Sequence, residues 1–386
     1  MRILLFSDEF PPMRGGIGTY CYNLATELAK LEQDILVLAN AHEDSAEFDQ
    51  NQLFEIKRIS RELNSKTALL VWARQLAMTL IRFRPDHVLI FGFSGQVIAA
   101  LVNLIMPFRY SVIIVGGDVG KYAESTVKKW LFQQLCNRSK NILAISHYVN
   151  NLLEEKFGTK WQRKTKVIYI GIDIEEYSQP VRDDLAELRQ KIGLEPHHKV
   201  ILTLARLSAR KGHKTIIQAM PKILEHFPDA RYVIAGGGGG INTPRHLREL
   251  VAEMNLDDFV LFTGEVAEED KISYLDLCDV FVMMSLQLQY AVEGLGISFL
   301  EASAREKPCI GSTHGGVQEV IVDNQTGYLL ESKDIDGLIE RLIDILESPK
   351  KATQFGQNGK QFVHTHFASP VTAQQVLATL TKDTTL

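Results

Sequence analysis

The sequence predicts an α/β protein built from two doubly wound parallel sheets, each in a domain of its own. Short apolar runs alternate with stretches of helical periodicity, the pattern of parallel strands joined by helices. The length of 386 residues suffices for two or three domains that each bury a core. A polar stretch over residues 178–198, with two prolines, separates two series of strands and reads as an interdomain linker with a short helix.

The first domain is expected over residues 1–178. Its predicted strands are residues 3–6, 35–38, 53–56, 87–91, 111–115, 141–145 and 166–170. Helical spacing of apolar residues is clearest over residues 20–31 and residues 67–83, and the second of these stretches ends before Pro85. Each strand is therefore followed by a segment that can cross over to the next parallel strand.

The second domain is expected over residues 179–366, with a separate C-terminal segment over residues 367–386. Its predicted strands are residues 199–204, 232–235, 259–266, 280–284 and 308–311. Helices are expected at residues 337–346 and 352–364. Asp334 and Asp336 form an Asp-x-Asp pair, but they precede a helix, where an aspartate is an ordinary N-cap, so we expect no metal there.

Composition excludes several classes of function. The net charge is -5, with +2 on residues 1–178 and -7 on the remainder, which does not favour nucleic-acid binding. The four cysteines are scattered and form no Cys-x-x-Cys pair, which fits a reducing cytosol without a metal site. The first apolar run is too short for a signal peptide, and the longest, residues 97–108, is about half of a membrane span. We therefore expect a cytoplasmic protein.

Residues 291–302 carry the strongest functional signal. A buried strand is followed by a turn with two glycines and then by an apolar-faced helix, an arrangement that suits an anion because free N–H groups and the helix dipole face it. Glu293 falls in the loop, and Glu301 falls about one turn into the helix, where it suits a ribose diol. The alternative is an ordinary helix start with an acidic first turn.

Further glycines and cations follow other predicted strands. Gly15 and Gly16 stand between a strand and a helix, where ligands bind in open α/β sheets, although a tight turn explains them equally. Arg206 and Lys211 follow the strand at residues 199–204 and can converge on one pyrophosphate; the alternative is a loop with surface charges. Gly236 opens a run of five glycines that allows close approach of a ligand or simply flexibility.

The spelling Glu-Gly-Leu-Gly-Ile-Ser-Phe-Leu-Glu-Ala over residues 293–302 resembles the signature of retaining GT-B glycosyltransferases of the family four (group 1) type. Residues 315–319 resemble the Gly-Gly-x-Pro-Glu turn of that family, with Gln318 in place of proline, and residues 324–330 follow the family style. The resemblance runs nearly end to end. It implies two Rossmann-like domains that face each other across a cleft, with the C-terminal segment crossing back onto the first domain.

The resemblance also implies a reaction. A hexose would move from a UDP or GDP sugar to an acceptor hydroxyl of a glycan or lipid-linked glycan, with retention of the anomeric configuration and without a metal or other cofactor. Glu293 would bind the sugar hydroxyls. Arg206, Lys211 and the helix start would stabilise the departing diphosphate. The implied donor-binding set is Gly15, Gly16, Arg206, Lys211, Gly236, Glu293, Gly294, Leu295, Gly296, Ile297 and Glu301.

One departure from the family pattern concerns the predicted first domain. The family often has His-Gly-x-Asp after the strand at residues 111–115; here Val115 replaces the histidine and Asp118 is retained. We expect Asp118 to contact the acceptor or the sugar. In the second domain, Arg210 and His213 lie beside the assigned cations, and we expect them on the surface.

Three other functions remain open at this stage. One is a nucleotide-sugar-binding protein without activity, and another is an inverting GT-B enzyme. The third is an NAD-dependent oxidoreductase, which the parallel sheets fit but which lacks the Gly-x-Gly-x-x-Gly fingerprint, because the first glycines stand at 15, 16 and 18.

Two basic sets mark the first domain. They are Lys57, Arg58, Arg61, Lys66, Arg74, Arg82 and Arg84, and then Lys121, Lys128, Lys129, Arg138 and Lys140. A solvated surface explains such sets, and so does a contact with an anionic acceptor or with a membrane surface. A peripheral membrane contact through these patches is therefore a further expectation. Trp72 and Trp130 read as core residues or as interfacial anchors.

Overall fold

The computed structural model describes residues 1–13, 15–60, 68–181, 184–238, 242–288 and 291–382. The chain divides into unit 1, Met1–Ile172 with Phe367–Leu386, and unit 2, Asp173–His366. The expected boundary at residue 178 lies a few residues further along the chain. Arg61 and Lys66 of the first basic set, and Gly239 and Gly240 of the glycine run, lie outside the described residues.

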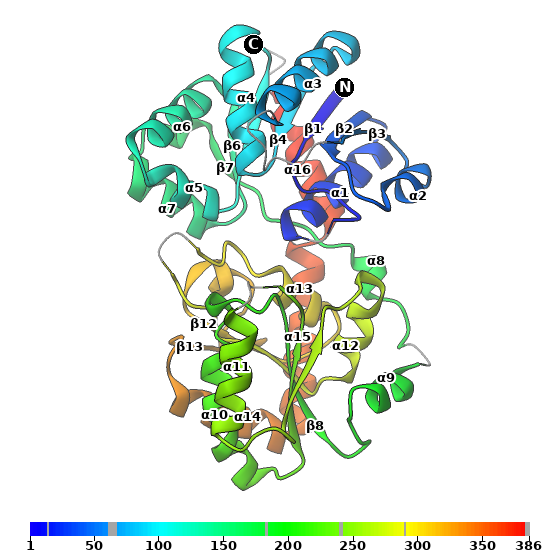
Figure 1. Ribbon diagram of the computed structural model, residues 1–386, viewed down its shortest axis with the longest axis vertical. Helices are drawn as coiled ribbons and strands as arrows, with labels where there is room; N and C mark the ends of the chain where they lie inside the picture. Colours follow the sequence, from blue (N-terminus) through cyan, green and yellow to red (C-terminus); the bar gives the residue numbers. More distant parts are fainter. Residues whose placement is uncertain (14, 61–67, 182–183, 239–241, 289–290, 383–386) are drawn as a thin grey trace. The chain divides into compact units, whose positions relative to one another are not determined.

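Unit 1 contains a seven-stranded parallel sheet of order β3-β2-β1-β4-β5-β6-β7 (Figure 1). The strands are β1 (Arg2–Phe6), β2 (Asp34–Asn40), β3 (Glu55–Ile59), β4 (His87–Ile90), β5 (Tyr110–Ile114), β6 (Asn141–Ala144) and β7 (Thr165–Val167). All side chains of β4, β5 and β6 are buried, as expected for central strands with helices on both faces. The order reverses beside β1, which makes the carboxyl edge near β1 and β4 a switch point.

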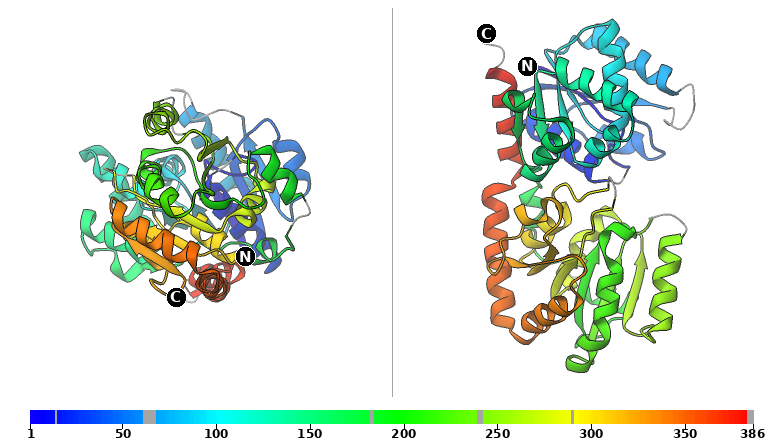
Figure 2. Two further views of the ribbon diagram at one scale, coloured as in Figure 1. Left: turned by 90° about the horizontal axis from the view of Figure 1, so that it is seen from below. Right: turned by 90° about the vertical axis from the view of Figure 1, so that its left-hand side faces the viewer.

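Helices cover both faces of this sheet. They are α1 (Gly16–Lys30), α2 (Ser45–Gln50), α3 (Ala68–Phe83), α4 (Phe93–Ile105), α5 (Gly117–Ala123), α6 (Thr126–Arg138), α7 (His147–Phe157) and α16 (Ser369–Lys382). Right-handed crossovers put α1 and α3 on opposite faces. The C-terminal helix α16 packs on α1, while α3, α4 and α6 form consecutive neighbours on the other face (Figure 2).

Backbone hydrogen bonds join the segment after Phe367 to unit 1. The Ile172 N–H donates to the Phe367 carbonyl at 2.8 Å, and the Ser369 N–H donates to the Ile172 carbonyl at 2.9 Å. Gly171 leaves no space for a side chain there, because an added Cβ would lie 2.5 Å from the Cα of Ser369. The C-terminal segment is therefore built into the first unit.

Unit 2 contains a six-stranded parallel sheet of order β10-β9-β8-β11-β12-β13. The strands are β8 (Lys199–Leu204), β9 (Ala230–Ala235), β10 (Val260–Gly264), β11 (Val280–Met283), β12 (Cys309–Ser312) and β13 (Gly327–Leu330). The helices are α8 (Ile174–Tyr177), α9 (Leu185–Lys191), α10 (His213–His226), α11 (Asn242–Glu253), α12 (Lys271–Leu277), α13 (Ile297–Ala304), α14 (Ile335–Glu347) and α15 (Pro349–His366). The predicted fold class, two doubly wound parallel sheets, is confirmed.

Several local predictions are also confirmed. The Asp334 carboxylate accepts a hydrogen bond from the Gly337 N–H at 2.9 Å and caps α14, as an N-cap aspartate does. Trp72 is fully buried in the unit 1 core. Trp130, in contrast, is 51% exposed on α6, so it is not a core residue. Strand β13 is an addition, because the sequence interpretation treated its residues only as a family motif.

Candidate functional site

The candidate site lies at the carboxyl edge of the unit 2 sheet, where β8, β11 and β12 end. After β8 the chain makes a short 3-10 turn, Ala209–Lys211, before α10 begins. After β11 it passes through Ser285 and the loop that leads to α13. After β12 a second 3-10 turn, Gly315–Glu319, lies against that loop. The carboxyl ends of adjacent parallel strands thus bring three distant segments together, the usual place for a ligand in such sheets.

The side chain of Glu293 joins these segments. Its Oε2 accepts from Arg210 Nη1 at 2.5 Å and from Lys211 Nζ at 2.6 Å. The Ser285 hydroxyl donates to the same oxygen at 3.4 Å. The side chains of Arg210, Lys211 and Glu293 are only 18%, 12% and 12% exposed. One carboxylate therefore pairs with two largely buried cations and neutralises only one of the two charges, which leaves a net positive charge for a second anion.

The electrostatics of the cluster follow from burial and from this pairing. Burial opposes ionisation of Glu293, but the positive charges of Lys211 and Arg210 outweigh it and lower the pKa of Glu293 to about 2. Burial lowers the pKa of Lys211, and the charge of Glu293 counteracts that effect. Glu293 is consequently an ionised carboxylate throughout the neutral range, and its charge is available to a polar ligand.

Two glycines hold the Glu293 loop in place. The Gly316 N–H donates to the Glu293 carbonyl at 2.8 Å. A Cβ on Gly315 would lie 2.2 Å from the Glu293 carbonyl oxygen, and a Cβ on Gly316 would lie 2.2 Å from that of Gly294. Gly315 also has a φ of 79°, which favours glycine. The backbone contact explains why a glycine pair stands here, although Gln318 replaces the expected proline.

The predicted helix start follows Glu293 directly. Gly296 is the N-cap residue of α13 with a φ of 96°, and Ile297 is the first residue of the helix. Leu295 is 2% exposed, so it anchors the turn in the core. The residues of this turn are buried or half-buried, and a helix N-terminus that follows a cluster with surplus positive charge is the environment that binds phosphate groups in α/β proteins.

Glu301 lies one turn into α13 and is 4% exposed. Its Oε1 accepts from the Tyr177 hydroxyl at 3.0 Å, and Lys271 Nζ lies 3.6 Å away. The Glu301 carboxylate, which belongs to α13, thus contacts one residue of α8 and one residue of α12. Its role as a ribose ligand stays a prediction.

Arg206 and Gly236 stand at the ends of β8 and β9. Arg206 is exposed, and its charge contributes to the lowered pKa of Lys211. Gly236 has a φ of 145°, and a Cβ there would lie 2.1 Å from the Ala205 carbonyl oxygen. Gly236 is therefore needed for the close approach of two strand ends. Whether it also contacts a ligand is a prediction, as is the role of Arg206.

The expectation that Arg210 and His213 lie on the surface is wrong. Arg210 belongs to the Glu293 cluster, because the 3-10 turn aims residues 210 and 211 at one carboxylate. His213 is 2% exposed, and its Nδ1 lies 3.1 Å from the Tyr232 hydroxyl oxygen. Burial lowers the pKa of His213 to about 4, so it is a neutral core residue. In the sequence, the one indication that Arg210 belongs to the site is that it adjoins Lys211. That adjacency does not predict the 3-10 turn that directs both side chains to Glu293.

In unit 1, Gly15 and Gly16 stand where α1 begins. Gly15 is its N-cap residue, and a Cβ there would lie 2.5 Å from Glu9 Oε2. Asp8, which sequence reasoning missed, follows β1 and accepts from the Ser94 N–H at 3.2 Å. Asp8 comes shortly after the apolar run of β1, and that position at a strand end was the signal that could have identified it.

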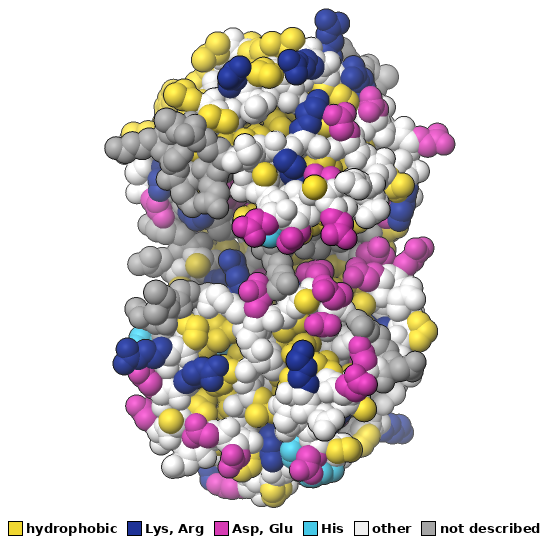
Figure 3. All heavy atoms as spheres, turned by 45° about the vertical axis from the view of Figure 1, so that its right-hand side comes forward, with side chains coloured by type: hydrophobic (Ala, Val, Ile, Leu, Met, Phe, Trp, Pro, Cys, Tyr) yellow, Lys and Arg dark blue, Asp and Glu magenta, His cyan; other side chains and the backbone are white. Residues whose placement is uncertain are grey.

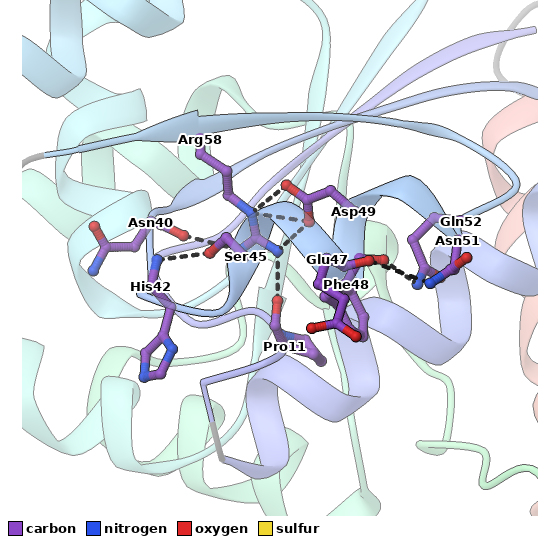
Figure 4. A network of polar contacts seen from close by, with 10 residues as sticks. All are labelled: Pro11, Asn40, His42, Ser45, Glu47, Phe48, Asp49, Asn51, Gln52 and Arg58. Atoms are coloured by element: carbon purple, nitrogen blue, oxygen red, sulfur yellow. Dashed lines mark hydrogen bonds and ion pairs between the residues drawn. The ribbon is translucent and has the colours of Figure 1, made fainter.

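Arg58 braces the loop before α1 (Figure 4). Its guanidinium donates to both oxygens of Asp49, to the Pro11 carbonyl at 2.6 Å and to the Asn40 carbonyl at 2.9 Å. The Arg58 side chain is 12% exposed. It therefore positions the strand ends and the loop that leads to Gly15, and it does not belong to the surface cations of the basic set.

Asp118 is 3% exposed at the start of α5. Its carboxylate accepts from the N–H groups of Gly116 and Val119 at 2.9 Å each, and from Gln96 Nε2 at 2.8 Å. Burial raises the pKa of Asp118 although these hydrogen bonds counteract it. In this structure Asp118 holds the turn after β5, and its contact with an acceptor or sugar stays a prediction.

Among the described residues, no group of three or more His, Cys, Asp or Glu side chains is arranged as metal ligands. The described helices also include none with the length and apolar character needed to cross a bilayer.

Two family descriptions match the chain. Residues 14–176 match Glycosyltransferase Family 4, and residues 184–362 match Glycosyl transferases group 1. A GDP-mannose-dependent alpha-(1-6)-phosphatidylinositol monomannoside mannosyltransferase of Mycolicibacterium smegmatis is 27% identical over 369 residues, covering 93% of each chain. An alpha-monoglucosyldiacylglycerol synthase of Streptococcus pneumoniae is 25% identical over 410 residues, covering 100% of this chain and 90% of the relative.

Solved structures show the same fold. HepE of Anabaena in complex with UDP-glucose has a TM-score of 0.83 and 20% identity, covering 99% of this chain and 100% of that one. At this identity the likeness concerns the fold, which is GT-B. Together with the two matched families, it shows that the chain belongs to the group 1, family four glycosyltransferases.

Proposed function

We propose that this glycosyltransferase moves a hexose from a nucleoside-diphosphate sugar to an acceptor hydroxyl, with retention of the anomeric configuration. The observation that carries the proposal is the cluster of Arg210, Lys211 and Glu293 beside a glycine-rich helix start. The hard step is departure of the diphosphate with its negative charge. Two preorganised cations and a helix N-terminus in a largely buried site supply the stabilisation that this step needs.

Different residues bind different parts of the donor. Lys211 and Arg210 bind the diphosphate, with Arg206 as a further cation from the same loop. Glu293 is ionised, so it accepts hydrogen bonds from sugar hydroxyls and orients the hexose. Glu301 binds the ribose diol through the same short helix, with Tyr177 and Lys271 holding its carboxylate. Gly236 gives space for the nucleotide at the end of β9.

Retention is proposed from the resemblance of residues 293–302 to the retaining family pattern. The acceptor hydroxyl would attack the face from which the diphosphate leaves, and a phosphate oxygen would take its proton. The C–O bond to the acceptor forms as the bond to the diphosphate breaks, and the proton ends on the leaving group. Such a step needs a well-bound diphosphate more than a separate general base, and no metal or cofactor is proposed.

The acceptor proposed is a lipid-linked glycan or glycolipid. Two relatives support this class, since one is named a phosphatidylinositol monomannoside mannosyltransferase and the other an alpha-monoglucosyldiacylglycerol synthase. Those names and the HepE complex mention different donors, GDP-mannose and UDP-glucose. The test therefore compares donors that differ in the base and in the sugar. Asp118 and the Gly15–Gly16 turn are the proposed unit 1 contacts for acceptor and donor.

The test is an assay of sugar release and transfer with UDP- and GDP-hexoses, followed by proton NMR of the new glycosidic bond. A product with the anomeric configuration of the donor supports the proposal. An inverted product contradicts retention and leaves the transfer itself intact. Tight nucleotide binding without sugar release would instead identify a binding protein, and binding of NAD alone would contradict the donor assignment.

A further inference from the structure

A second surface in unit 1 has a composition that the transfer reaction does not explain. Helices α3, α4 and α6 lie side by side on one face of the sheet. Within their bounds the three helices carry five cations and no Asp or Glu. The cations are Arg74, Arg82, Lys128, Lys129 and Arg138. A solvated protein surface normally mixes both signs of charge, so three adjacent helices without a carboxylate are unusual.

Large apolar side chains stand exposed among these cations. Ile105 is 89% exposed, Val127 is 75% exposed and Leu70 is 71% exposed. Ile81, Trp130 and Leu104 are also exposed, at 62%, 51% and 37%. We name these six residues and the five cations the α3–α4–α6 surface. Scattered single apolar residues need no explanation, but several on neighbouring helices mark an interaction surface.

The exposed residues follow the helix periodicity. On α3, Leu70, Arg74 and Ile81 are spaced by four and seven residues, so they lie on one side of the helix. The inner side of α3 is formed by Trp72, Leu76 and Phe83, which are buried in the core. The outer stripe is consequently directed away from the sheet.

The helices are also joined at their C-terminal ends. Arg138 Nη1, at the end of α6, donates to the Asn103 carbonyl near the end of α4 at 3.5 Å. In Figure 3, hydrophobic side chains gather with Lys and Arg side chains at the uppermost end of unit 1. This end carries the amino ends of the strands and the C-terminal ends of the helices, with Ile81, Arg82 and Ile105. Leu70 and the residues from Val127 to Trp130 lie in the first turns of α3 and α6, so the surface runs along the length of these helices.

We propose that the α3–α4–α6 surface docks on an anionic lipid bilayer. Apolar side chains with Trp among them enter the interface, and cations around them attract acidic headgroups. Glu124, just before α6, pairs with Lys128. The described parts of the three helices hold no carboxylate that could neutralise the other four cations, which can therefore attract acidic headgroups. The proposal rests on the proposed function in one respect, because a lipid-linked acceptor would be presented at such a surface.

A second copy of this chain is a weaker fit. A two-fold dimer through this surface would place five cations opposite five identical cations, with no carboxylate from these helices to compensate. Charge complementarity therefore favours a phosphate-bearing lipid surface over self-association.

The experiment is co-flotation of the full chain with vesicles of phosphatidylcholine alone and with vesicles that contain phosphatidylglycerol. Binding is expected only with the anionic vesicles, and it should weaken as salt rises. In Arg74→Glu/Arg82→Glu the partition constant should fall by about 25-fold or more, from about fivefold for each cation lost. Ile105→Asp should lower it by about tenfold or more, because a charge replaces a buried apolar contact.

Matched controls distinguish binding through this surface from an effect of overall charge or of any exposed apolar side chain. Lys222→Glu/Arg245→Glu changes two exposed cations of unit 2, with side chains 64% and 77% exposed. Leu53→Ser removes a 68% exposed apolar residue of unit 1 outside these helices. Both controls should bind anionic vesicles as the unaltered chain does.

Three results would overturn the proposal. They are equal binding to neutral and anionic vesicles, no binding to either, and a dimer in light scattering that Ile105→Asp abolishes. Sugar release from the donor in solution, without vesicles, should be unchanged in all variants. Sugar release tests the proposed function, and vesicle binding tests the docking proposal. An unaltered chain that releases no sugar would contradict only the first, and one that binds no vesicles would contradict only the second.

Discussion

Lys211 Nζ lies 2.6 Å from Glu293 Oε2, in the position that a donor phosphate oxygen is proposed to take. Arg210 shares the same oxygen at 2.5 Å. The two cations are thus held by a carboxylate of the protein. Binding of a diphosphate would replace that carboxylate on the cations and release Glu293 to the sugar hydroxyls. Donor binding and orientation of the hexose become one event, and this relationship leads to several predictions.

Glu293→Gln should bind a nucleoside diphosphate more tightly than the unaltered chain, by about tenfold, because the competing negative charge is gone while both cations remain. Its kcat should fall on the order of a hundredfold, since a neutral amide orients the sugar less well. Calorimetric titration and steady-state kinetics measure the two effects. The control is Glu306→Gln, an exposed carboxylate paired with Lys360. Weaker nucleotide binding in Glu293→Gln would show that Glu293 is itself a nucleotide ligand.

The pairing of Glu293 also predicts a pH dependence of stability. The folded pKa is about 2 and the ordinary value is 4.5, so its contribution is fully present above 4.5 and is lost as pH falls toward 2. The difference in free energy of unfolding between the unaltered chain and Glu293→Gln should shrink by up to about 1.4 kcal/mol per pH unit in that window. Urea unfolding at several pH values measures it. A difference that stays constant down to about pH 3 would contradict the ion pair.

Arg210 and Arg206 should differ in their effect on stability. Arg210→Ala removes one of the two cationic partners of a largely buried carboxylate and should destabilise the chain by about 2 kcal/mol. Arg206 is exposed, so Arg206→Ala should change stability by less than about 0.5 kcal/mol while lowering kcat/KM for the donor. Thermal unfolding and donor kinetics of both variants test this. Equal destabilisation by both changes would mean that Arg206 also supports the fold.

The turn at Gly316 should tolerate no side chain. A Cβ there would lie 2.2 Å from the Gly294 carbonyl oxygen, so Gly316→Ala must displace the Glu293 loop. We expect a loss of about 1–3 kcal/mol in stability and a fall in kcat of at least about tenfold. Gly117→Ala is the control, because an added Cβ there meets no atom within 4 Å. Normal activity in Gly316→Ala would show that the loop position does not govern the reaction.

Strands and helices could largely be predicted from the sequence, because buried parallel strands such as β8 and β11 are continuous apolar runs. Asp334 could be placed because an N-cap depends on a few adjacent residues. Lys211 and Glu293 could be assigned to one site because each follows a strand of the same sheet. Such signals are local in the chain or follow from the general geometry of parallel sheets.

Arg210 could not be placed from the sequence. Its position depends on the 3-10 turn at Ala209–Lys211, and its partner is 83 residues away. Arg58 was likewise counted with surface cations, although its contacts with Asp49, Asn40 and Pro11 come from three segments brought together by the sheet edge. A charged residue looks the same in a sequence whether it is solvated or paired in the interior. Only the tertiary contacts decide.

The central claim is that Lys211 and its neighbours bind the diphosphate of a sugar donor. The most direct measurement is thermal melting of the unaltered chain, Lys211→Ala and the control Lys214→Ala with UDP, GDP, ADP and NAD in separate samples. We predict a rise of several degrees with one nucleoside diphosphate, corresponding to about 2.7 kcal/mol at a hundred times the dissociation constant. Lys214 is exposed on the next turn, so its variant should keep the rise, and Lys211→Ala should lose it. A rise only with NAD, or one that Lys211→Ala retains in full, would contradict the account.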